Sequence, residues 1–184
     1  MNNAVLINQT SGDYEWYTPE PLIAAARKTM GSIDLDPASS VQANQRVRAS
    51  TFYTEEMDGL SLPWFGNVFL NHPFGRTTNK AWIDKLCASF TLGFTKQSIN
   101  LCFCSSSEAW FQPLYNFPIC FISPRVHYVL PDGSIKKGCT KGSVAVYMGN
   151  RIGHFIDNFS KFGRIMIPEW RVQPPGECRC GLYI

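Results

Sequence analysis

The chain has 184 residues, a length that suits a single domain with one hydrophobic core. Apolar residues make up 45% and charged residues 17%, which excludes a disordered chain, and no apolar run approaches the roughly 18 residues of a membrane span. The net charge of +3 is compatible with a nucleic-acid partner but does not by itself indicate one.

The first element predicted along the chain is a helix. Thr18 is a favourable N-cap, Pro19 suits the first helical position, and an apolar pattern continues to Met30. Gly31 follows as a stop signal, because glycine readily ends a helix in the left-handed region. Residues 32–36 are then predicted to form a short strand.

A second helix is predicted over residues 38–48, with Val41 and Val47 facing the core. Residues 51–54 have an extended character and lead into an acidic segment. That segment ends in a turn over residues 58–60, where the Asp-Gly pair is a turn signal on its own.

Strands and helices alternate through the middle of the chain. Continuous apolar runs predict buried strands over residues 67–70, 98–104 and 119–122. Helical patterns between them predict helices over residues 78–89 and 107–115. Strands that alternate with helices favour a three-layer α/β fold around a mostly parallel sheet.

The last two predicted strands are residues 125–130 and 143–148. The loop between them is polar, carries lysines and has no helical pattern, so we expect the two strands to pair antiparallel and to close the sheet. Residues 168–184 contain proline and glycine and are predicted to form an extended tail. The expected organisation is a flexible arm over residues 1–13, one domain over residues 14–167, and this tail.

The seven cysteines favour reduced thiols. Their number is odd and the sequence shows no signal-peptide pattern, so we expect a cytosolic setting. Cys102 and Cys104 fall within an apolar run and are interpreted as packing residues. Cys178 and Cys180 have neither a CxxC spacing nor a histidine nearby, so no metal site is predicted.

A polar turn follows the strand predicted over residues 67–70. In open α/β sheets, ligands bind beyond the carboxyl ends of the strands. Methylation of an amino group on a base needs two acceptors aimed at one NH2, which the Asn71 side-chain oxygen and the His72 backbone carbonyl could supply. Pro73 stiffens the turn, and Phe74 offers a flat face on which a base can stack. An ordinary loop after a strand is the alternative.

The order of several short motifs resembles the phage-type DNA N-6-adenine methyltransferase family over roughly residues 13–149. The segments that carry the resemblance are, in order, Glu15 to Pro19, Asp34 to Ala38, Phe52 with Tyr53, Asp58 to Leu60 with Trp64, Asn71 to Phe74, Trp82 to Lys85, Pro124 to Val126 and Ser143 to Val146. The resemblance implies a Rossmann-like methyltransferase fold with S-adenosyl-L-methionine as cofactor and DNA as partner. It further implies transfer to N6 of a flipped-out adenine. A phage or prophage origin would place the chain in the cytoplasm of a bacterial host.

The same resemblance implies a cofactor site. Asp36 would lie near the methionine part of the cofactor, although it could also cap the next helix. Asp58 would lie at the adenine end, with ordinary turn chemistry as the alternative. Trp16 could pack either on the cofactor or in the core. The implied cofactor-binding residues are Trp16, Thr18, Pro19, Asp36, Pro37, Asp58 and Gly59.

The chain departs from the family's pattern in two places. The predicted catalytic turn is formed by residues 71–74. In it, His72 stands where the family usually has proline, and Phe74 stands where it usually has tyrosine. The acceptor required at position 72 is a backbone carbonyl, which histidine also supplies. In the cofactor loop, no glycine run follows Asp36, and we identify no acidic ribose ligand at a second strand.

Contacts with DNA are expected from basic and polar residues around the catalytic turn and in the closing strands. The candidates are Arg76, Asn79, Lys80, Arg125, His127, Lys136, Lys137 and Lys141. Phosphate contacts would position the DNA without specifying a sequence, and a solvated basic loop is the alternative for the lysines. Because the chain has no spare segment for a recognition domain, we expect a short or relaxed target sequence.

Three alternatives to an adenine methyltransferase remain open. The same turn could act on N4 of cytosine or on a base in RNA, and the fold could be a degenerate module that binds nucleic acid without turnover. Methylation at C5 of cytosine is not expected, since it needs a cysteine nucleophile and no cysteine stands at a strand-end turn. We expect direct in-line transfer without a covalent intermediate.

Overall fold

The computed structural model describes residues 16–75, 77–130, 132–136 and 141–169. The strands of the main sheet are β1 (Leu35–Asp36), β2 (Thr51–Phe52), β3 (Gly66–Leu70), β4 (Thr95–Phe103), β5 (Ile119–Ile122), β8 (Ser143–Met148) and β9 (Gly163–Met166). A separate hairpin contains β6 (Tyr128–Val129) and β7 (Ile135–Lys136). The helices are α2 (Glu20–Met30), α3 (Val41–Val47), α4 (Asn79–Thr91), α5 (Ile152–Phe159) and the 3-10 helices η1 (Ala109–Asn116) and η2 (Ser160–Phe162).

The main sheet has seven strands in the order β2-β1-β3-β4-β8-β5-β9. β2, β1, β3 and β4 form a parallel run. β8 is inserted antiparallel between β4 and β5, and β9 pairs antiparallel with β5 at the edge. The fold is therefore mixed α/β, with its parallel strands on one side and its antiparallel pairs on the other.

The predicted closing strand pair is wrong. Tyr128 and Val129 pair with Lys136 and Ile135 in the β6–β7 hairpin, whereas residues 143–148 form β8 inside the main sheet. All six residues of β8 are buried, as expected for a strand with neighbours on both sides and helices over both faces. A polar loop between two apolar runs does not reveal that the second run is enclosed by strands from elsewhere.

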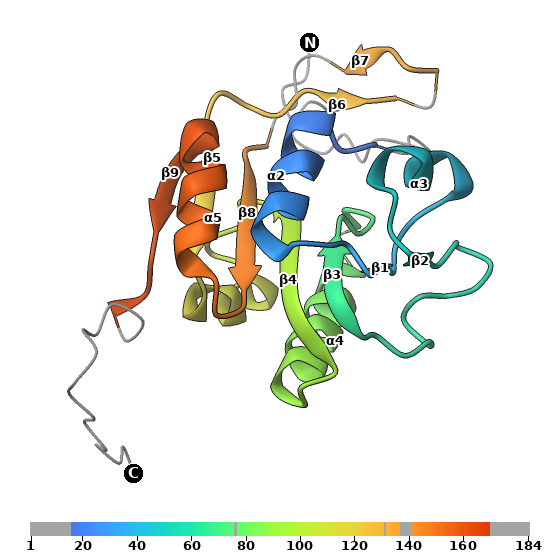
Figure 1. Cartoon of the computed structure of the whole chain (residues 1–184), viewed down its shortest axis with the longest axis horizontal. Coiled ribbons are helices and arrows are strands. Elements are labelled where there is room, and N and C mark those ends of the chain that lie inside the picture. Colours follow the sequence, from blue (N-terminus) through green and yellow to red (C-terminus); the bar gives the residue numbers. More distant parts are fainter. Residues whose placement is uncertain (1–15, 76, 131, 137–140, 170–184) are drawn as a thin grey trace, which may run out of the picture.

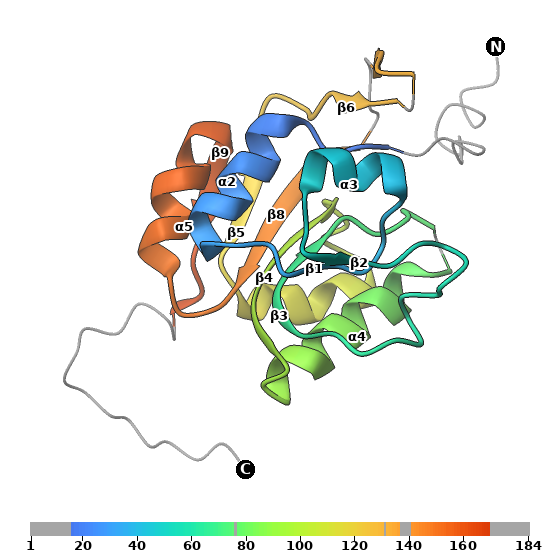
Figure 2. The ribbon, with the colours of Figure 1, turned by 45° about the vertical axis from the view of Figure 1, so that its right-hand side comes forward.

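Helices cover both faces of the sheet (Figures 1 and 2). On one face, α2 and α5 pack together, and their core residues include Ile23, Phe155 and Phe159. On the other face, α4 and η1 contribute core residues that include Leu86 and Phe111. The three-layer arrangement predicted from the sequence is thus present. In the part of the chain that the structure describes, no helix is long and apolar enough to cross a membrane.

The first helix begins one residue later than predicted. Pro19 is the N-cap of α2 in an extended conformation, and Thr18 provides no side-chain cap. Gly31 ends this helix with φ 93°, as predicted. In α3, Ser40 is the cap and accepts from the Ala43 N–H at 3.1 Å. Because α3 begins at Val41, that side chain points outward and is 64% exposed, so its predicted burial is wrong.

The other predicted elements are present with small differences in their ends. The strands over residues 67–70, 98–104 and 119–122 correspond to β3, β4 and β5. The helix predicted over residues 107–115 is the 3-10 helix η1, because Pro113 within it cannot donate a backbone hydrogen bond. The sequence patterns predicted no helix or strand after residue 148, but α5 and β9 follow there and extend the domain.

Candidate active site

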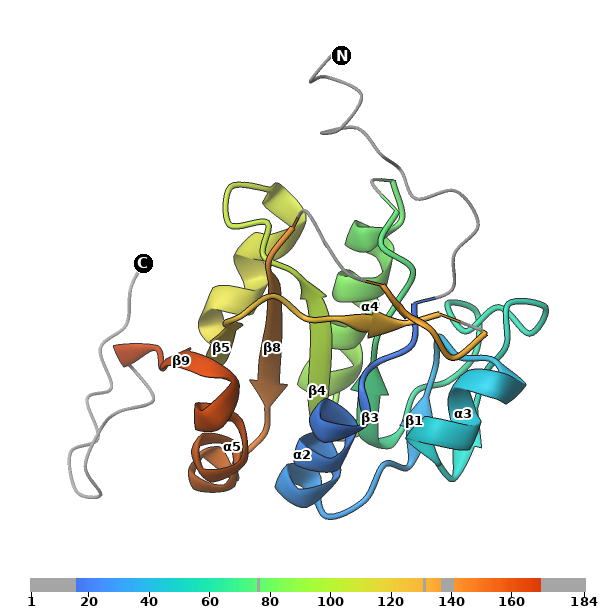
Figure 3. The ribbon, with the colours of Figure 1, turned by 90° about the horizontal axis from the view of Figure 1, so that it is seen from above.

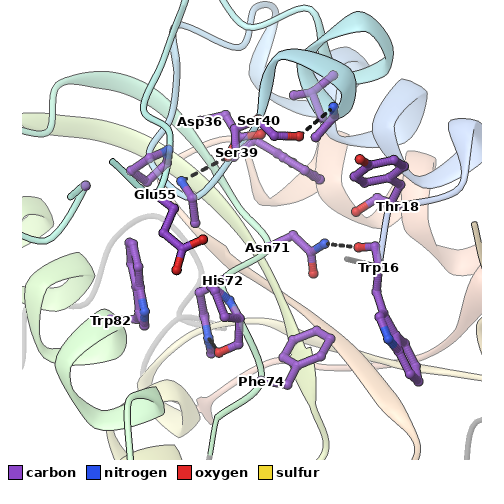
Figure 4. Close-up of a pocket in the computed structure, with 18 of the residues that line it drawn as sticks. Trp16, Thr18, Asp36, Ser39, Ser40, Glu55, Asn71, His72, Phe74 and Trp82 are labelled. Carbon is purple, nitrogen blue, oxygen red and sulfur yellow. Dashed lines mark hydrogen bonds between the residues drawn. The ribbon is translucent and has the colours of Figure 1, made fainter. Parts of the chain in front are cut away.

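A pocket of about 890 Å³ lies at the carboxyl ends of β1 and β3. Because β1 and β3 are neighbouring parallel strands, the residues that follow them meet at one edge of the sheet. Figure 4 shows the side chains around this space. The predicted residues that line it are Trp16, Thr18, Asp36, Pro37, Asp58, Gly59, Asn71, His72, Pro73 and Phe74. Pro19 is absent from the lining.

Asn71, the first residue after β3, has a fixed amide orientation. Its Nδ2 donates to the Trp16 backbone carbonyl at 3.1 Å (Figure 4). Since a carbonyl only accepts, the nitrogen of the amide must face Trp16, and Oδ1 is left as the acceptor. This Oδ1 is buried and has no hydrogen-bond partner within the described part of the chain. The turn therefore holds an unused acceptor at the end of the strand.

His72 is buried and neutral. Its Nδ1 lies 3.0 Å from the Pro73 carbonyl, so Nδ1 carries the proton. Nε2 is then an acceptor, and none of the described residues donates to it. The ring lies parallel to Trp82, with centroids 6.2 Å apart and an interplanar angle of 7°. Burial lowers the pKa of His72 to about 4, and the Pro73 carbonyl acts in the opposite sense. The imidazole is thus uncharged near neutral pH.

Aromatic rings form one wall of the pocket. Phe74 packs on Phe103 with ring centroids 4.1 Å apart, and Trp16 meets Phe103 edge-on at 6.5 Å. The Tyr128 ring packs against the Trp16 ring, with centroids 5.4 Å apart. Lys141 Nζ lies 5.5 Å from the centre of the Phe103 ring. Phe103 ends β4, so a third strand contributes to the same edge.

Asp36 is a buried carboxylate. Burial raises its pKa to about 7, while the hydrogen bond from the Ala38 N–H opposes that shift. The Ala38 N–H lies 3.3 Å from Oδ1. No ion pair to Asp36 occurs among the described residues, and Ser40, not Asp36, caps α3. A buried carboxylate without a counter-charge favours a cationic ligand.

Acidic groups predominate in the charged lining of the pocket. Among the described lining residues, Asp36, Glu55 and Asp58 are acidic, and Arg46 is the one cation. Glu55 stands just beyond β2, and in Figure 4 its carboxylate points into the space between Trp82 and Asn71. The sequence reasoning missed this residue, although an acidic residue roughly 20 positions beyond the first strand end is the signal for a ribose ligand.

The Asp58-Gly59 turn packs against the loop after β1. The Asp58 carboxylate accepts from the Leu60 N–H at 3.1 Å, so the turn chemistry expected as an alternative is present. Asp58 also has φ 51°, and Gly59 is buried. A Cβ at Gly59 would lie 1.8 Å from the Pro37 carbonyl oxygen, so only glycine permits this approach. The contact fixes one wall of the pocket.

Several buried polar atoms of the lining have no hydrogen-bond partner among the residues that the structure describes. They include Trp16 Nε1, Thr18 Oγ1, Asn71 Oδ1 and His72 Nε2. Such atoms are uncommon in folded proteins and indicate a missing partner, such as a ligand. Among the described residues, no group of three His, Cys, Asp or Glu side chains could hold a metal ion. The unpaired atoms therefore mark positions in the lining at which a bound molecule could donate or accept hydrogen bonds.

Comparison with known protein families connects this geometry to a group of enzymes. Residues 7–160 match the family described as DNA N-6-adenine-methyltransferase (Dam). The chain belongs to this family. The resemblance inferred from the ordered motifs is thereby confirmed. No curated protein and no solved structure matches the chain.

The residues expected to contact DNA have different environments in this Dam-family chain. Lys80 pairs with Asp84 at 2.5 Å, and Asn79 is buried at the start of α4, so a DNA contact would require it to be uncovered. Arg125, His127 and Lys141 are exposed. Arg76, Lys137 and the Lys136 side chain lie outside the described residues.

The β6–β7 hairpin lies over the carboxyl end of the sheet in this Dam-family chain (Figure 3). The Tyr17 N–H donates to the Val129 carbonyl at 2.8 Å, and the Val129 N–H donates back at 3.0 Å. This bridge joins the hairpin to the segment that carries Trp16 and Thr18. The exposed residues near the hairpin are therefore on the pocket's side of the molecule.

Proposed function

We propose that the chain transfers a methyl group from S-adenosyl-L-methionine to N6 of an adenine flipped out of DNA. The observation that carries the proposal is the orientation of Asn71, whose Oδ1 is an unused, buried acceptor at a strand end. Phe74 lies beside it in the same pocket and offers a stacking face. Membership in the Dam family supports adenine as the target.

Two acceptors would orient the amino group of the base. Asn71 Oδ1 is one, and the backbone carbonyl of His72 is the other, since it accepts no hydrogen bond from the described residues. Acceptors on both amino hydrogens hold the nitrogen with its lone pair free for attack. The neutral His72 side chain is not required as a base, because the proton lost after transfer can pass to water.

The lining fits the proposed cofactor. S-adenosyl-L-methionine carries an ammonium and a sulfonium. The described lining has more carboxylates than cations, and this balance of charge favours a positively charged ligand. When bound, the cofactor supplies a methyl group activated by the sulfonium. We assign Asp36, with Thr18, to the methionine part, Glu55 to the ribose and Asp58 to the adenine. Pro37 and Gly59 would shape the wall between them.

The proposed protein–DNA interface is the rim on which Arg125, His127 and Lys141 are exposed. Cations there would neutralise phosphates and hold the duplex while the base enters the pocket. Phosphate contacts carry no sequence information, so a short or relaxed target sequence is part of the proposal. Cys102 and Cys104 are absent from the lining, which argues against a cysteine nucleophile.

Methyl transfer from labelled S-adenosyl-L-methionine to unmethylated DNA, followed by nucleoside mass spectrometry, tests the proposal. We expect N6-methyladenine from the wild type and a rate lower by on the order of 100-fold for Asn71→Ala, which loses a preorganised hydrogen-bonding group. Asn150→Ala, an exposed asparagine just after β8, is the matched control and should keep full activity.

Three other outcomes would contradict the proposal in different ways. N4-methylcytosine would change the substrate while keeping the site. Cofactor binding without transfer to DNA would point to another acceptor such as RNA. Absence of both transfer and cofactor binding would favour a module that binds nucleic acid without turnover.

A further inference from the structure

The Trp16 side chain is held rigidly beside the catalytic turn. Its carbonyl accepts from Asn71 Nδ2, and the next residue, Tyr17, is bridged in both directions to Val129. Its ring packs against Tyr128 and Phe103. An indole fixed on several sides cannot easily turn to find a new partner. These contacts therefore fix the direction in which the indole N–H points.

Contacts with other aromatic rings account for the burial of the Trp16 ring, but they provide no acceptor for its N–H. Nε1 is buried and has no hydrogen-bond partner among residues 16–169 that the structure describes. An indole N–H can only donate, so water or a ligand with an acceptor is needed to satisfy it. Trp16 lines the pocket, and in Figure 4 its indole extends along the same side as Phe74. The missing acceptor is therefore expected from a molecule in the pocket.

Trp16 and Asn71 supply a donor and an acceptor to the lining of the same pocket. Asn71 Oδ1 accepts, Trp16 Nε1 donates, and the two residues are joined by their own hydrogen bond. The Watson–Crick edge of adenine has the complementary order, an amino group beside the ring acceptor N1. We propose that Trp16 is a base-reading residue whose Nε1–H donates to N1 of the target adenine. The assignment rests on the proposed function and replaces the expectation that Trp16 packs on the cofactor.

The pairing would reject two of the other DNA bases. Guanine and thymine present a ring N–H at the equivalent position, so two donors would face each other at Trp16, and their carbonyl oxygen would face Asn71 Oδ1. Cytosine presents the same order as adenine, so its exclusion would depend on ring size. Trp16 would therefore act on specificity as well as on affinity.

Modified bases test the contact one atom at a time. Oligonucleotides that carry adenine, 1-deazaadenine or 7-deazaadenine at a site methylated by the wild type are compared by kcat/KM. We expect 1-deazaadenine to lower kcat/KM about tenfold, because it leaves the indole N–H without its acceptor, and 7-deazaadenine to have little effect. Trp16→Phe should be about tenfold slower on adenine and equally fast on adenine and 1-deazaadenine.

The comparison of ratios removes effects of 1-deazaadenine on base pairing, since these are the same for both enzymes. Trp110→Phe, on η1 and outside the lining, is the matched control and should behave as the wild type. The assignment would be overturned if the ratio of kcat/KM on adenine to kcat/KM on 1-deazaadenine were the same for the wild type and Trp16→Phe. It would also be overturned if 7-deazaadenine lowered kcat/KM more than 1-deazaadenine does. Either result would leave the proposed function intact. A target base placed opposite an abasic site makes no base pair, so on such DNA the wild-type ratios test the contact even if Trp16→Phe folds poorly. If the wild type methylated no adenine at all, both the role of Trp16 and the proposed function would be refuted.

Discussion

Replacing Asp36 by asparagine should stabilise the protein at high pH. The buried carboxyl has a pKa raised from 3.8 to about 7, so the folded state keeps its proton over a range in which the unfolded chain has released it. The free energy of unfolding contributed by Asp36 therefore falls as the pH rises from about 4 to about 7. Asparagine has the same shape and no charge, so Asp36→Asn avoids this loss.

The size of the effect follows from the pKa. A change from 3.8 to about 7 corresponds to about 4 kcal/mol of unfolding free energy. We expect Asp36→Asn and the wild type to be equally stable near pH 4, and the variant to be more stable by up to about 4 kcal/mol at pH 8. His72 titrates in the opposite sense, since burial lowers its pKa to about 4, but it is present in both proteins and cancels from the difference.

Urea unfolding at a series of pH values between 4 and 8 measures this difference directly. Calorimetric titration with S-adenosyl-L-methionine over the same range gives a second readout. Ionised Asp36 should attract the ammonium, so the wild type should bind more tightly than Asp36→Asn above pH 7, with the advantage shrinking below it. A stability difference that does not change with pH would refute the reasoning about burial. Equal cofactor affinities at pH 8 would refute the assigned contact.

Two further variants test the packing of the fold and of the site. Tyr147→Phe should lower the unfolding free energy by about 1–3 kcal/mol, because the buried hydroxyl donates to Gln97 at 2.7 Å, whereas the exposed control Tyr115→Phe should change it by less than about 0.5 kcal/mol. Equal melting temperatures for the two variants would contradict this. Gly59→Ala should cost about 1–3 kcal/mol and weaken cofactor binding, because its Cβ has no room, and Gly153→Ala, with nothing within 4 Å, is the control. Unchanged stability and binding in Gly59→Ala would show that the loop opposite adjusts freely.

The position of the proposed catalytic turn, residues 71–74, was predictable because its signal is local. A buried apolar run followed at once by a polar, proline-containing turn places Asn71 at a strand end wherever the strand sits in the sheet. The position of residues 143–148 was not predictable in the same way. Their apolar run fits any enclosed strand, and only long-range pairing with β4 and β5 decides its neighbours.

Glu55 and Trp16 show why part of the site could not be predicted from the sequence. β2 has two residues, and its end is defined by pairing with β1, so the placement of Glu55 depends on a register that no local pattern contains. Trp16 was a candidate for either cofactor or core. Its unpaired nitrogen becomes visible only when Asn71, Phe103 and Tyr128 are assembled around it.

The missing glycine run after Asp36 has a structural counterpart in the Asp58-Gly59 turn, which packs against the same loop. In many nucleotide-binding folds, glycine after the first strand lets backbone approach the ligand or another chain segment closely. Here the close approach is made from the other side, where Gly59 meets the Pro37 carbonyl. The residues of the first loop are then free to be polar, and Ser40 caps α3. A glycine-poor loop after the first strand is therefore compatible with a cofactor pocket, because the glycine that it requires lies on the facing turn.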